Sequence, residues 1–417
     1  MNSTMEDQIV VGVDIGTTKV CAVVAATDEL NRVNILGMGL SPSEGLSRGV
    51  VVNIDKTVVA IQQALEEAAH AAGVDVHSVV VGIAGDHVQS FQSRGVITIR
   101  EGEITEHDVQ RLLEDTTHVA MPADREILHV IPQEFIVDGQ DGVSDPVGMS
   151  GVRMEANVHI ITGLVTAARN IYRCIEKAGY EVADIVLEPI ASAQAVLHPE
   201  EKEIGVVLVD IGGGTTDIAV FEGNTIRHTA VVAIAGNQVT HDIRKGLGLL
   251  WDQAEALKRQ FGVALVDLVT EDPIISIPGI AGRPKKSISQ STLAQIIQPR
   301  VEEILEIVSM EIKRSGYSRH LPSGVVLTGG GSLIRGTVEL AEEILGMDVR
   351  LGRPVGIAGG LVEEVSQPQF STGVGLVLYG LEKGVGHQHL LGGSRNGIDD
   401  NLFARILHRM RHWFQEL

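Results

Sequence analysis

The sequence predicts an α/β protein with two related lobes, and three observations support this fold class. The chain has 417 residues, a length that favours more than one domain. Its composition, 44% hydrophobic but only 3% aromatic, suits cores of Val, Ile, Leu and Ala between sheets and helices. The sequence Asp-Ile-Gly follows an apolar run at Asp14 and again at Asp210. This repeat indicates an internally duplicated chain in which each half begins with a strand hairpin.

Each predicted hairpin has a tip of small residues between two β-branched strands. The first joins residues 9–13 to 20–25 across the turn 14–19, and the second joins 204–209 to 218–221 across the turn 210–217. Glycines let backbone N–H groups approach phosphate oxygens, and threonine hydroxyls add further donors. A Gly-Thr turn can also simply close a hairpin. The presence of two copies favours phosphate binding.

A third glycine-rich segment, residues 328–332, follows a predicted strand at 325–327 and precedes a predicted helix at 337–345. Such a segment before a helix suits an anion or a nucleotide. Asp14 and Asp210 end their strands, where carboxylates can hold Mg²⁺ through its waters, and Lys19 can reach phosphates. The predicted nucleotide-binding residues are therefore Asp14, Gly16, Thr17, Thr18, Lys19, Asp210, Gly212, Gly213, Gly214, Thr215, Thr216, Gly329, Gly330, Gly331 and Ser332.

Two segments interrupt the duplicated plan. Residues 85–161 contain short strand-like runs, several turns and one helix at 106–117. This mixture indicates an inserted subdomain. Long helical stretches at 238–261 and 291–315 enclose a second inserted unit. The remaining predicted elements are helices at 56–72, 170–178 and 189–197 and strands at 79–83 and 185–187.

The C-terminal segment has a different character. Residues 383–401 are rich in Gly, Ser, Asn and His and predict a flexible linker, while residues 402–417 predict an amphipathic helix. Its apolar face comprises Leu402, Phe403, Ile406, Leu407, Met410, Trp413, Phe414 and Leu417, and its basic face includes Arg405 and Arg409. This pattern favours a helix lying in the surface of an anionic membrane. The alternative is a helix docked on the protein's own core or on a partner.

Charge and hydropathy limit the possible partners. The formal charge of −21 argues against general nucleic-acid binding. Basic residues at Arg283, Lys285, Lys286 and Arg300 could steer an acidic peptide, although a solvated loop is the simpler interpretation on composition alone. No apolar run approaches the roughly 20 residues that span a bilayer, and no secretory signal is visible. Two cysteines, Cys21 and Cys174, are expected in the core of a protein from a reducing cytoplasm.

Five motifs, in order, resemble those of the actin, sugar-kinase and heat-shock ATPase superfamily. They are the two phosphate turns, residues 188–193 and 371–380 as connecting helices, and residues 328–332 as the adenosine motif. The resemblance implies an actin-like, ribonuclease H-like two-lobed fold that binds ATP and Mg²⁺. It also implies that Glu188 and Asp210 position Mg²⁺ or the attacking water and that Glu255 and Lys258 contact the ribose. An ordinary solvated i,i+3 ion pair would explain the last two equally well.

The inserted subdomain and the terminal helix make the chain resemble the bacterial cell-division FtsA family. This resemblance implies subdomain 1A (residues 1–84 and 162–198), 1C (85–161), 2A (199–236 and 324–370), 2B (237–323) and a return helix at 371–382. It implies filaments on the cytoplasmic face of the inner membrane at the division site, with at most weak ATP hydrolysis. The tail of FtsZ would dock on 2B at Arg283, Lys285, Lys286 and Arg300, and 1C would contact later division proteins and the next subunit.

Two alternatives share the core motifs. A sugar-kinase-type enzyme would need an acidic residue over a sugar pocket, and the sequence shows no candidate for it. A pilus-assembly actin homologue of the PilM type shares the core and an insert like 1C, but as a family it binds a partner's peptide and has no terminal lipid-binding helix. The amphipathic segment 402–417 favours the FtsA family over both.

Overall fold

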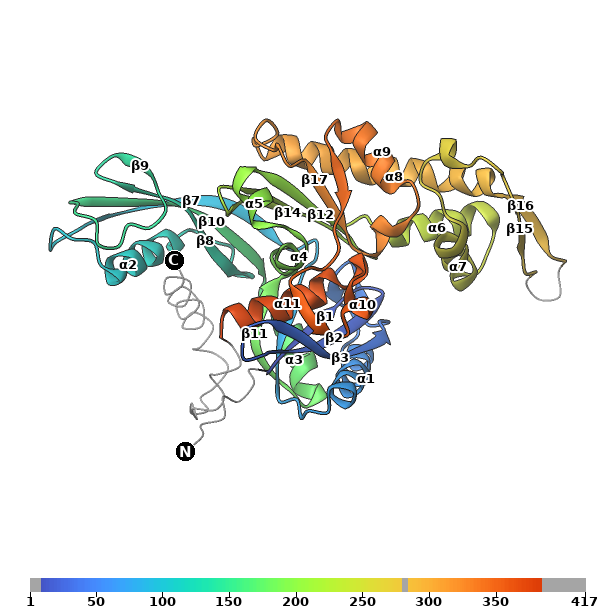
Figure 1. Ribbon diagram of the computed structural model, residues 1–417, viewed down its shortest axis with the longest axis horizontal. Coiled ribbons are helices and arrows are strands. Elements are labelled where there is room, and N and C mark those ends of the chain that lie inside the picture. The colour runs from blue at the N-terminus through green and yellow to red at the C-terminus, as the bar shows by residue number, and fades with distance from the viewer. Residues whose placement is uncertain (1–8, 280–283, 385–417) are drawn as a thin grey trace.

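The computed structural model describes residues 9–279 and 284–384 of the protein (Figure 1). Arg283, the predicted linker beyond Gly384 and the predicted helix 402–417 lie outside the described residues. Two lobes form the centre of the molecule, and two inserted units project from it at opposite ends of the long axis (Figure 1). Within the described part of the chain, no helix is long and apolar enough to cross a membrane.

The first lobe is built on a six-stranded sheet in the order β11-β6-β1-β2-β3-β19. Its strands are β1 (Ile9–Ile15), β2 (Lys19–Thr27), β3 (Val33–Pro42), β6 (Ser78–Ile83), β11 (Glu181–Leu187) and β19 (Ile357–Gly360). Helices α1 (Ile54–Ala72) and α3 (Val165–Ala178) share a core with one face of this sheet. The central strands are almost continuously apolar because helices cover both faces.

The second lobe repeats this plan on a five-stranded sheet in the order β14-β13-β12-β17-β18. Its strands are β12 (Val206–Ile211), β13 (Thr216–Glu222), β14 (Thr225–Val232), β17 (Val325–Thr328) and β18 (Val349–Leu351). In both lobes the first three strands are antiparallel neighbours, and the next two strands join in parallel beside the first. The predicted duplication, with both hairpins, is confirmed.

Helices α4 (Glu188–Val196) and α11 (Ser371–Glu382) lie between the two sheets (Figure 1). They share one hydrophobic core with Val10 and Cys21 of the first lobe and with Val206 and Leu208 of the second. Cys21 and Cys174 are both buried free thiols, as predicted. The two lobes are therefore joined through apolar packing on this shared pair of helices.

The close crossing of α4 and α11 depends on Gly375. A Cβ at this position would lie 1.8 Å from the carbonyl oxygen of Ala191 in the neighbouring helix. We expect Gly375→Ala to lower the free energy of unfolding by about 2–3 kcal/mol, measured by urea denaturation, because two backbones would have to separate. Gly246→Ala is the control, since its Cβ would meet only the end of the Ile296 side chain at 3.2 Å. An equal loss in both variants would contradict this explanation.

The first insert forms a separate four-stranded sheet in the order β7-β10-β8-β9. Its elements are β7 (Gln89–Thr98), α2 (Glu106–Thr117), β8 (Arg125–Val137), β9 (Gln140–Val143) and β10 (Arg153–Leu164). Helix α2 begins with a capping box between Thr105 and Asp108 and packs its apolar side on the sheet, in a core that includes Phe135. This insert therefore has a core of its own.

The second insert contains α6 (Gly236–Leu247), α7 (Trp251–Phe261), β15 (Ile274–Ile277), β16 (Lys286–Ser289) and the start of α8 (Gln290–Arg314). The predicted continuous helix at 238–261 is wrong. Gly248 ends α6 with a left-handed φ of +66°, a conformation that favours glycine, and the chain turns before α7 begins.

Shorter elements complete the fold. They are β4 (Leu46–Ser47), β5 (Val50–Val51), α5 (Pro199–Ile204), α9 (Thr337–Leu345), α10 (Val362–Val365) and three 3₁₀ turns at Val266–Leu268, Gly330–Leu333 and Pro368–Phe370.

Candidate nucleotide site

The two predicted phosphate turns meet tip to tip between the lobes. A Cβ on Gly213 would lie 2.4 Å from Thr18 Cγ2, and one on Gly214 would lie 2.5 Å from Thr17 Oγ1. The turns share one backbone pattern, because the N–H of Gly16 donates to Lys19 O at 3.0 Å and that of Gly212 donates to Thr215 O at 2.9 Å. Only glycine allows this close approach of the two tips.

The third glycine-rich segment packs against the end of β12, beside the second turn. Gly329 has a φ of +81°, and a Cβ there would lie 2.2 Å from Asp210 Oδ1. A Cβ on Gly331 would lie 2.4 Å from Ile211 Cγ2, and Ser332 Oγ donates to Gly329 O at 2.7 Å. The structure therefore brings all three predicted glycine-rich segments together.

Four carboxyl groups gather below the two tips. Asp14 and Asp210 end their strands and are buried, and Asp217 lies opposite Asp210 in the strand ladder. Glu188 begins α4, and its side chain lies over Gly82, whose Cβ would be 3.0 Å from Glu188 Cγ. Asp217 Oδ1 is buried and has no hydrogen-bond partner in the described part of the protein. Like charges are concentrated here at a high electrostatic cost.

Burial dominates the proton affinity of this cluster. It raises the pKa of Asp210 to about 6. The negative charge of Asp14 also raises this pKa, whereas the hydrogen bond that Ser192 donates lowers it. Burial and the carboxylates of Asp14, Asp217 and Asp210 together raise the pKa of Glu188 well above its usual range. Burial, followed by the charge of Asp210, does the same to Asp217. A bound cation would relieve this repulsion.

Lys19 supplies positive charge beside the cluster. Its Nζ lies 3.4 Å from Asp14 Oδ2 and 5.3 Å from the centre of the Phe370 ring. Burial lowers the pKa of Lys19, but the charge of Asp14 opposes this effect and the pKa is raised overall. Lys19 therefore remains a cation next to both turns.

The residues present fit a hydrated Mg²⁺. Crowded carboxylates and the unpaired oxygen of Asp217 favour a cation that brings its own waters. Among the described residues, no group of three or more His, Cys, Asp or Glu side chains is arranged to bind a metal ion directly.

Lys258 and Glu255 form the predicted i,i+3 pair, with 2.8 Å between Lys258 Nζ and Glu255 Oε2. Lys258 is buried rather than solvated, and its Nζ also donates to Gly236 O at 3.0 Å and to Thr240 Oγ1 at 2.9 Å. Gly236 in turn donates to Gly212 O at 3.1 Å. The pair thus holds the start of α6 against the second turn, and burial lowers the pKa of Lys258.

Sequence reasoning missed three side chains of the site. Ser192 Oγ donates to Asp210 Oδ2 at 2.7 Å and lies 3.0 Å from Thr372 Oγ1. Asp217 closes the second phosphate turn, and Thr215 Oγ1 donates to its Oδ2 at 3.2 Å. The acidic residue directly after the second Gly-Thr turn, where the first turn has Lys19, was the available signal for Asp217, whereas Ser192 and Thr372 carry no local signal.

The predicted partner-binding residues lie on the second insert. Lys285 is exposed, and Lys286 Nζ donates to Leu247 O at 3.1 Å. Arg300 forms ion pairs with Asp242, at 2.6 Å, and with Glu303. The hydrogen bond that Arg300 donates to Asp242 raises the pKa of Arg300, so much of its charge is already neutralised locally.

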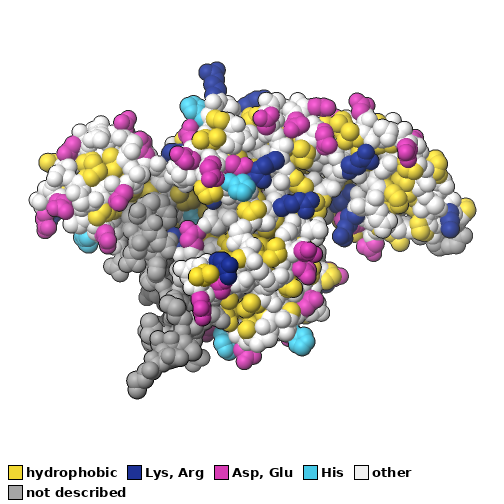
Figure 2. All heavy atoms as spheres, viewed as in Figure 1, with side chains coloured by type: hydrophobic (Ala, Val, Ile, Leu, Met, Phe, Trp, Pro, Cys, Tyr) yellow, Lys and Arg dark blue, Asp and Glu magenta, His cyan; other side chains and the backbone are white. Residues whose placement is uncertain are grey.

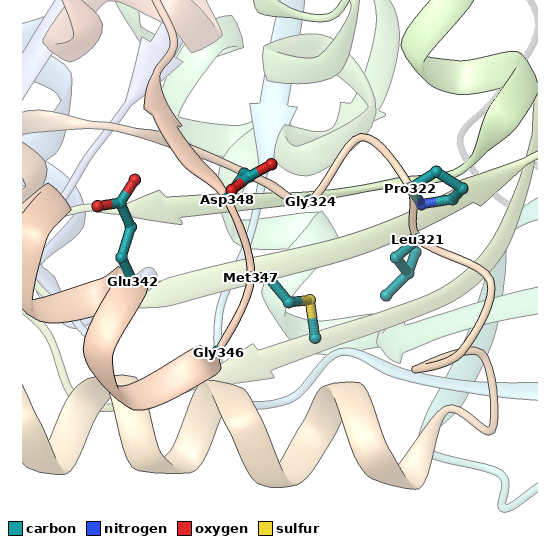
Figure 3. A pocket seen from close by; sticks show the side chains of 7 residues that line it. All are labelled: Leu321, Pro322, Gly324, Glu342, Gly346, Met347 and Asp348. Atoms are coloured by element: carbon teal, nitrogen blue, oxygen red, sulfur yellow. The ribbon is translucent and has the colours of Figure 1, made fainter.

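Acidic side chains are spread over the face in Figure 2, among scattered Lys and Arg side chains. A surface cavity of about 580 Å³ lies in the second lobe, where the turn after α9 meets the loop before β17 (Figure 3). Its lining contains no predicted site residue and comprises Leu321, Pro322, Gly324, Glu342, Gly346, Met347 and Asp348. The candidate nucleotide site is therefore defined by the converging glycine-rich turns rather than by this cavity.

Known protein sequences identify the family of this chain. A family profile described as "Cell division protein FtsA" matches residues 207–375, and one described as "SHS2 domain inserted in FTSA" matches residues 85–162. A cell division protein FtsA from Pseudomonas aeruginosa is 45% identical over 415 residues, which cover 100% of this chain and 99% of that relative. The chain belongs to the FtsA family of cell-division proteins. FtsA of Escherichia coli K12 is 39% identical and covered in full, as is this chain.

Solved structures show the same fold as this FtsA-family chain. The PilM–PilN type IV pilus biogenesis complex matches with a TM-score of 0.66 at 18% identity, covering 89% of this chain and 98% of that chain. MreB5 of Spiroplasma citri bound to ADP matches with a TM-score of 0.54 at 15% identity, covering 92% and 99%. A MamK double helical filament matches with a TM-score of 0.51 at 14% identity, covering 88% and 97%. The predicted actin-like fold with its inserted domain is confirmed.

Proposed function

We propose that the protein binds Mg-ATP between its lobes and uses it to fix an arrangement that is competent for assembly. The observation that carries this proposal is the meeting of Gly213 and Gly214 with Thr17 and Thr18 above the carboxyl cluster. Backbone N–H groups at both tips would bind phosphates from each lobe, so one ligand would join them. The solved MreB5 relative of the same fold is bound to ADP.

Individual side chains take defined roles in this proposal. Asp14 and Asp210 would hold the waters of Mg²⁺, and Lys19, which lies 3.4 Å from Asp14, would contribute a positive charge toward the phosphates. Glu188 would orient the attacking water, and Lys258 and Glu255, which lie beside the start of α6, would contact the ribose. Mg²⁺ itself would neutralise charge on the phosphates when bound. Hydrolysis is expected to be weak, with ATP acting mainly as an assembly ligand.

The same proposal covers the partners. The chain would polymerise on the cytoplasmic face of the inner membrane through the helix at 402–417, anchor FtsZ by its acidic tail on the second insert, and recruit later division proteins through the first insert. Membership of a cell-division family supports the setting. A filament among the structures of the same fold supports self-association.

Electron microscopy on lipid monolayers tests this function. We expect filaments on an anionic monolayer with Mg-ATP, and we expect added FtsZ tail peptide to bind them. A monolayer without filaments in Mg-ATP, under conditions where the protein binds lipid, would contradict assembly. Filaments that form equally well without nucleotide would contradict the proposed role of ATP.

The proposed docking of the FtsZ tail on the second insert can be tested separately. We expect Lys285→Glu with Lys286→Glu to weaken binding of the FtsZ tail peptide at least about tenfold, because rim charges attract an acidic peptide. The dissociation constant can be measured by fluorescence anisotropy at several salt concentrations. Lys313→Glu with Arg314→Glu, in the last turn of α8, is a matched control that reverses two adjacent basic residues on another element. If the control weakens peptide binding as much as the variant at Lys285 and Lys286, the loss reflects the net charge of the protein and not a contact at these two residues.

A further inference from the structure

Strand β8 of the first insert makes hydrogen bonds to both lobes. Near one end, His129 Nε2 accepts a hydrogen bond at 3.0 Å from the backbone N–H of Leu187. Toward the other end, Gln133 Nε2 donates to the carbonyl oxygens of Ile226, at 2.8 Å, and Arg227, at 3.1 Å, on the edge strand β14. One strand of the insert therefore forms hydrogen bonds both with Leu187, just before α4, and with the second lobe.

The bond from Leu187 has a direct bearing on Glu188. Leu187 is the N-cap residue of α4 and provides no side-chain cap, and Glu188 is the next residue. His129 is buried, and accepting a hydrogen bond at Nε2 requires the neutral ring with its own proton on Nδ1. Removing this acceptor would leave a buried N–H group unpaired at the start of the helix.

Glu188 needs such a restraint. Burial and the charges of Asp14, Asp217 and Asp210 all disfavour its ionised form. The position of its carboxyl group therefore depends on how the backbone at the start of α4 is held. Gly82 supports the side chain from below, and His129 holds the preceding amide.

The contact with the second lobe is built from several bonds. Gln133 has no partner in the ladder between β8 and β10, and a bulge of this kind re-aims a side chain. Arg227 Nη1 returns a bond to Gln133 O at 3.1 Å. Ser90 Oγ donates to Thr229 O at 2.9 Å, and the buried His159 Nε2 lies 3.0 Å from Thr229 Oγ1. Strand β14 pairs with β13, which follows the second phosphate turn directly.

We propose that His129 is a positioning residue for Glu188 and that, through β8, nucleotide occupancy is coupled to the attachment of the insert to β14. The proposal rests on the proposed nucleotide binding. Nucleotide that fixes Glu188 strengthens the contacts of His129 and Gln133, and by reciprocity a firmly attached insert strengthens nucleotide binding. The insert then reports the nucleotide state to whatever binds its outer surface.

Hydrogen exchange of the full chain, with and without saturating Mg-ATP, tests the coupling. We expect Mg-ATP to slow exchange of the amides at 226–229 about fivefold or more in the unaltered protein. His129→Leu should lose this response and speed exchange of the Leu187 amide even without nucleotide. His129→Gln should retain the response, because its side-chain carbonyl can accept the same bond.

Gln133→Leu is the second variant, since it cuts the other end of the connection and leaves His129 in place. It should lose the response at 226–229 while the Leu187 amide exchanges as in the unaltered protein. A full response in His129→Leu or in Gln133→Leu, with Mg-ATP bound at saturation, would overturn the coupling alone. Failure of the unaltered protein to bind Mg-ATP would instead overturn the proposed function and the coupling with it.

Discussion

Mg-ATP is expected to bind about 100-fold more weakly when Asp210 is replaced by asparagine. A charge-assisted contact is worth about 1.5–3 kcal/mol, and each 1.4 kcal/mol changes affinity tenfold. Asp210 ends β12 beside the third glycine-rich segment and faces Asp14 of the other lobe, so its charge acts where the cation and phosphates would lie. Titration with a fluorescent ATP analogue in Mg²⁺ measures the loss. Unchanged nucleotide affinity would remove Asp210 from the site.

The same substitution should stabilise the protein without ligand. Burial, with Asp14, raises the pKa of Asp210 to about 6, against the hydrogen bond from Ser192. A shift of this size corresponds to about 3 kcal/mol by which ionised Asp210 destabilises the fold. The folded protein binds the proton more tightly than the unfolded chain, so the penalty is complete above pH 6 and fades as the pH falls toward the ordinary value of 3.8. Asp210→Asn should therefore raise the melting temperature at pH 8 more than at pH 5.

Ser192→Ala is the matched control for both measurements. It removes the hydroxyl that donates to Asp210 Oδ2 at 2.7 Å and leaves the carboxylate in place. We expect its Mg-ATP affinity to stay within several-fold of the unaltered protein, because the carboxylate that acts on the cation keeps its charge. A loss as large as that of Asp210→Asn would assign the effect to local structure instead of to the charge.

The phosphate turns could be predicted because their requirement is local. A backbone that must approach phosphate, or another turn, needs glycine at fixed positions, and this need is visible in the sequence around Gly16 and Gly213. The carboxylates of Asp14 and Asp210 could also be predicted from the sequence, because each one directly follows an apolar strand. Alternation of apolar strands and helices predicted the layers of both lobes.

The rest of the site depends on tertiary packing. Ser192 and Thr372 meet only because α4 and α11 cross between the sheets, a contact between segments 180 residues apart. Spacing in the sequence predicted the pair of Glu255 and Lys258. The burial of Lys258 could not be predicted, because it arises only when α6 packs against the second phosphate turn. Helical periodicity also continued across Gly248, where a left-handed backbone ends the helix.

Deletion of residues 402–417 is expected to abolish co-sedimentation with anionic vesicles. The segment combines eight apolar residues on one predicted face with Arg405 and Arg409 on the other, and three of the apolar residues, Phe403, Trp413 and Phe414, are aromatic. A surface helix gains affinity from buried apolar area and from attraction to anionic lipid, so both contributions vanish with the segment. Trp413→Glu with Phe414→Glu is a milder test that keeps the length of the chain. Retained binding by the truncated protein would defeat the anchor proposal.

Assembly should strengthen this attachment, because one short amphipathic helix binds a membrane only marginally while linked copies bind by avidity. Full-length protein in Mg-ATP is therefore expected to bind vesicles at least about tenfold more tightly than the same protein without nucleotide. Asp210→Asn, whose terminal segment is intact, should show the weak, nucleotide-independent binding of a monomer. If monomers and filaments bind lipid equally well, the single helix is sufficient and the coupling of nucleotide to membrane attachment fails. If Asp210→Asn instead binds vesicles in Mg-ATP as tightly as the unaltered protein, assembly on the membrane does not depend on the carboxyl cluster.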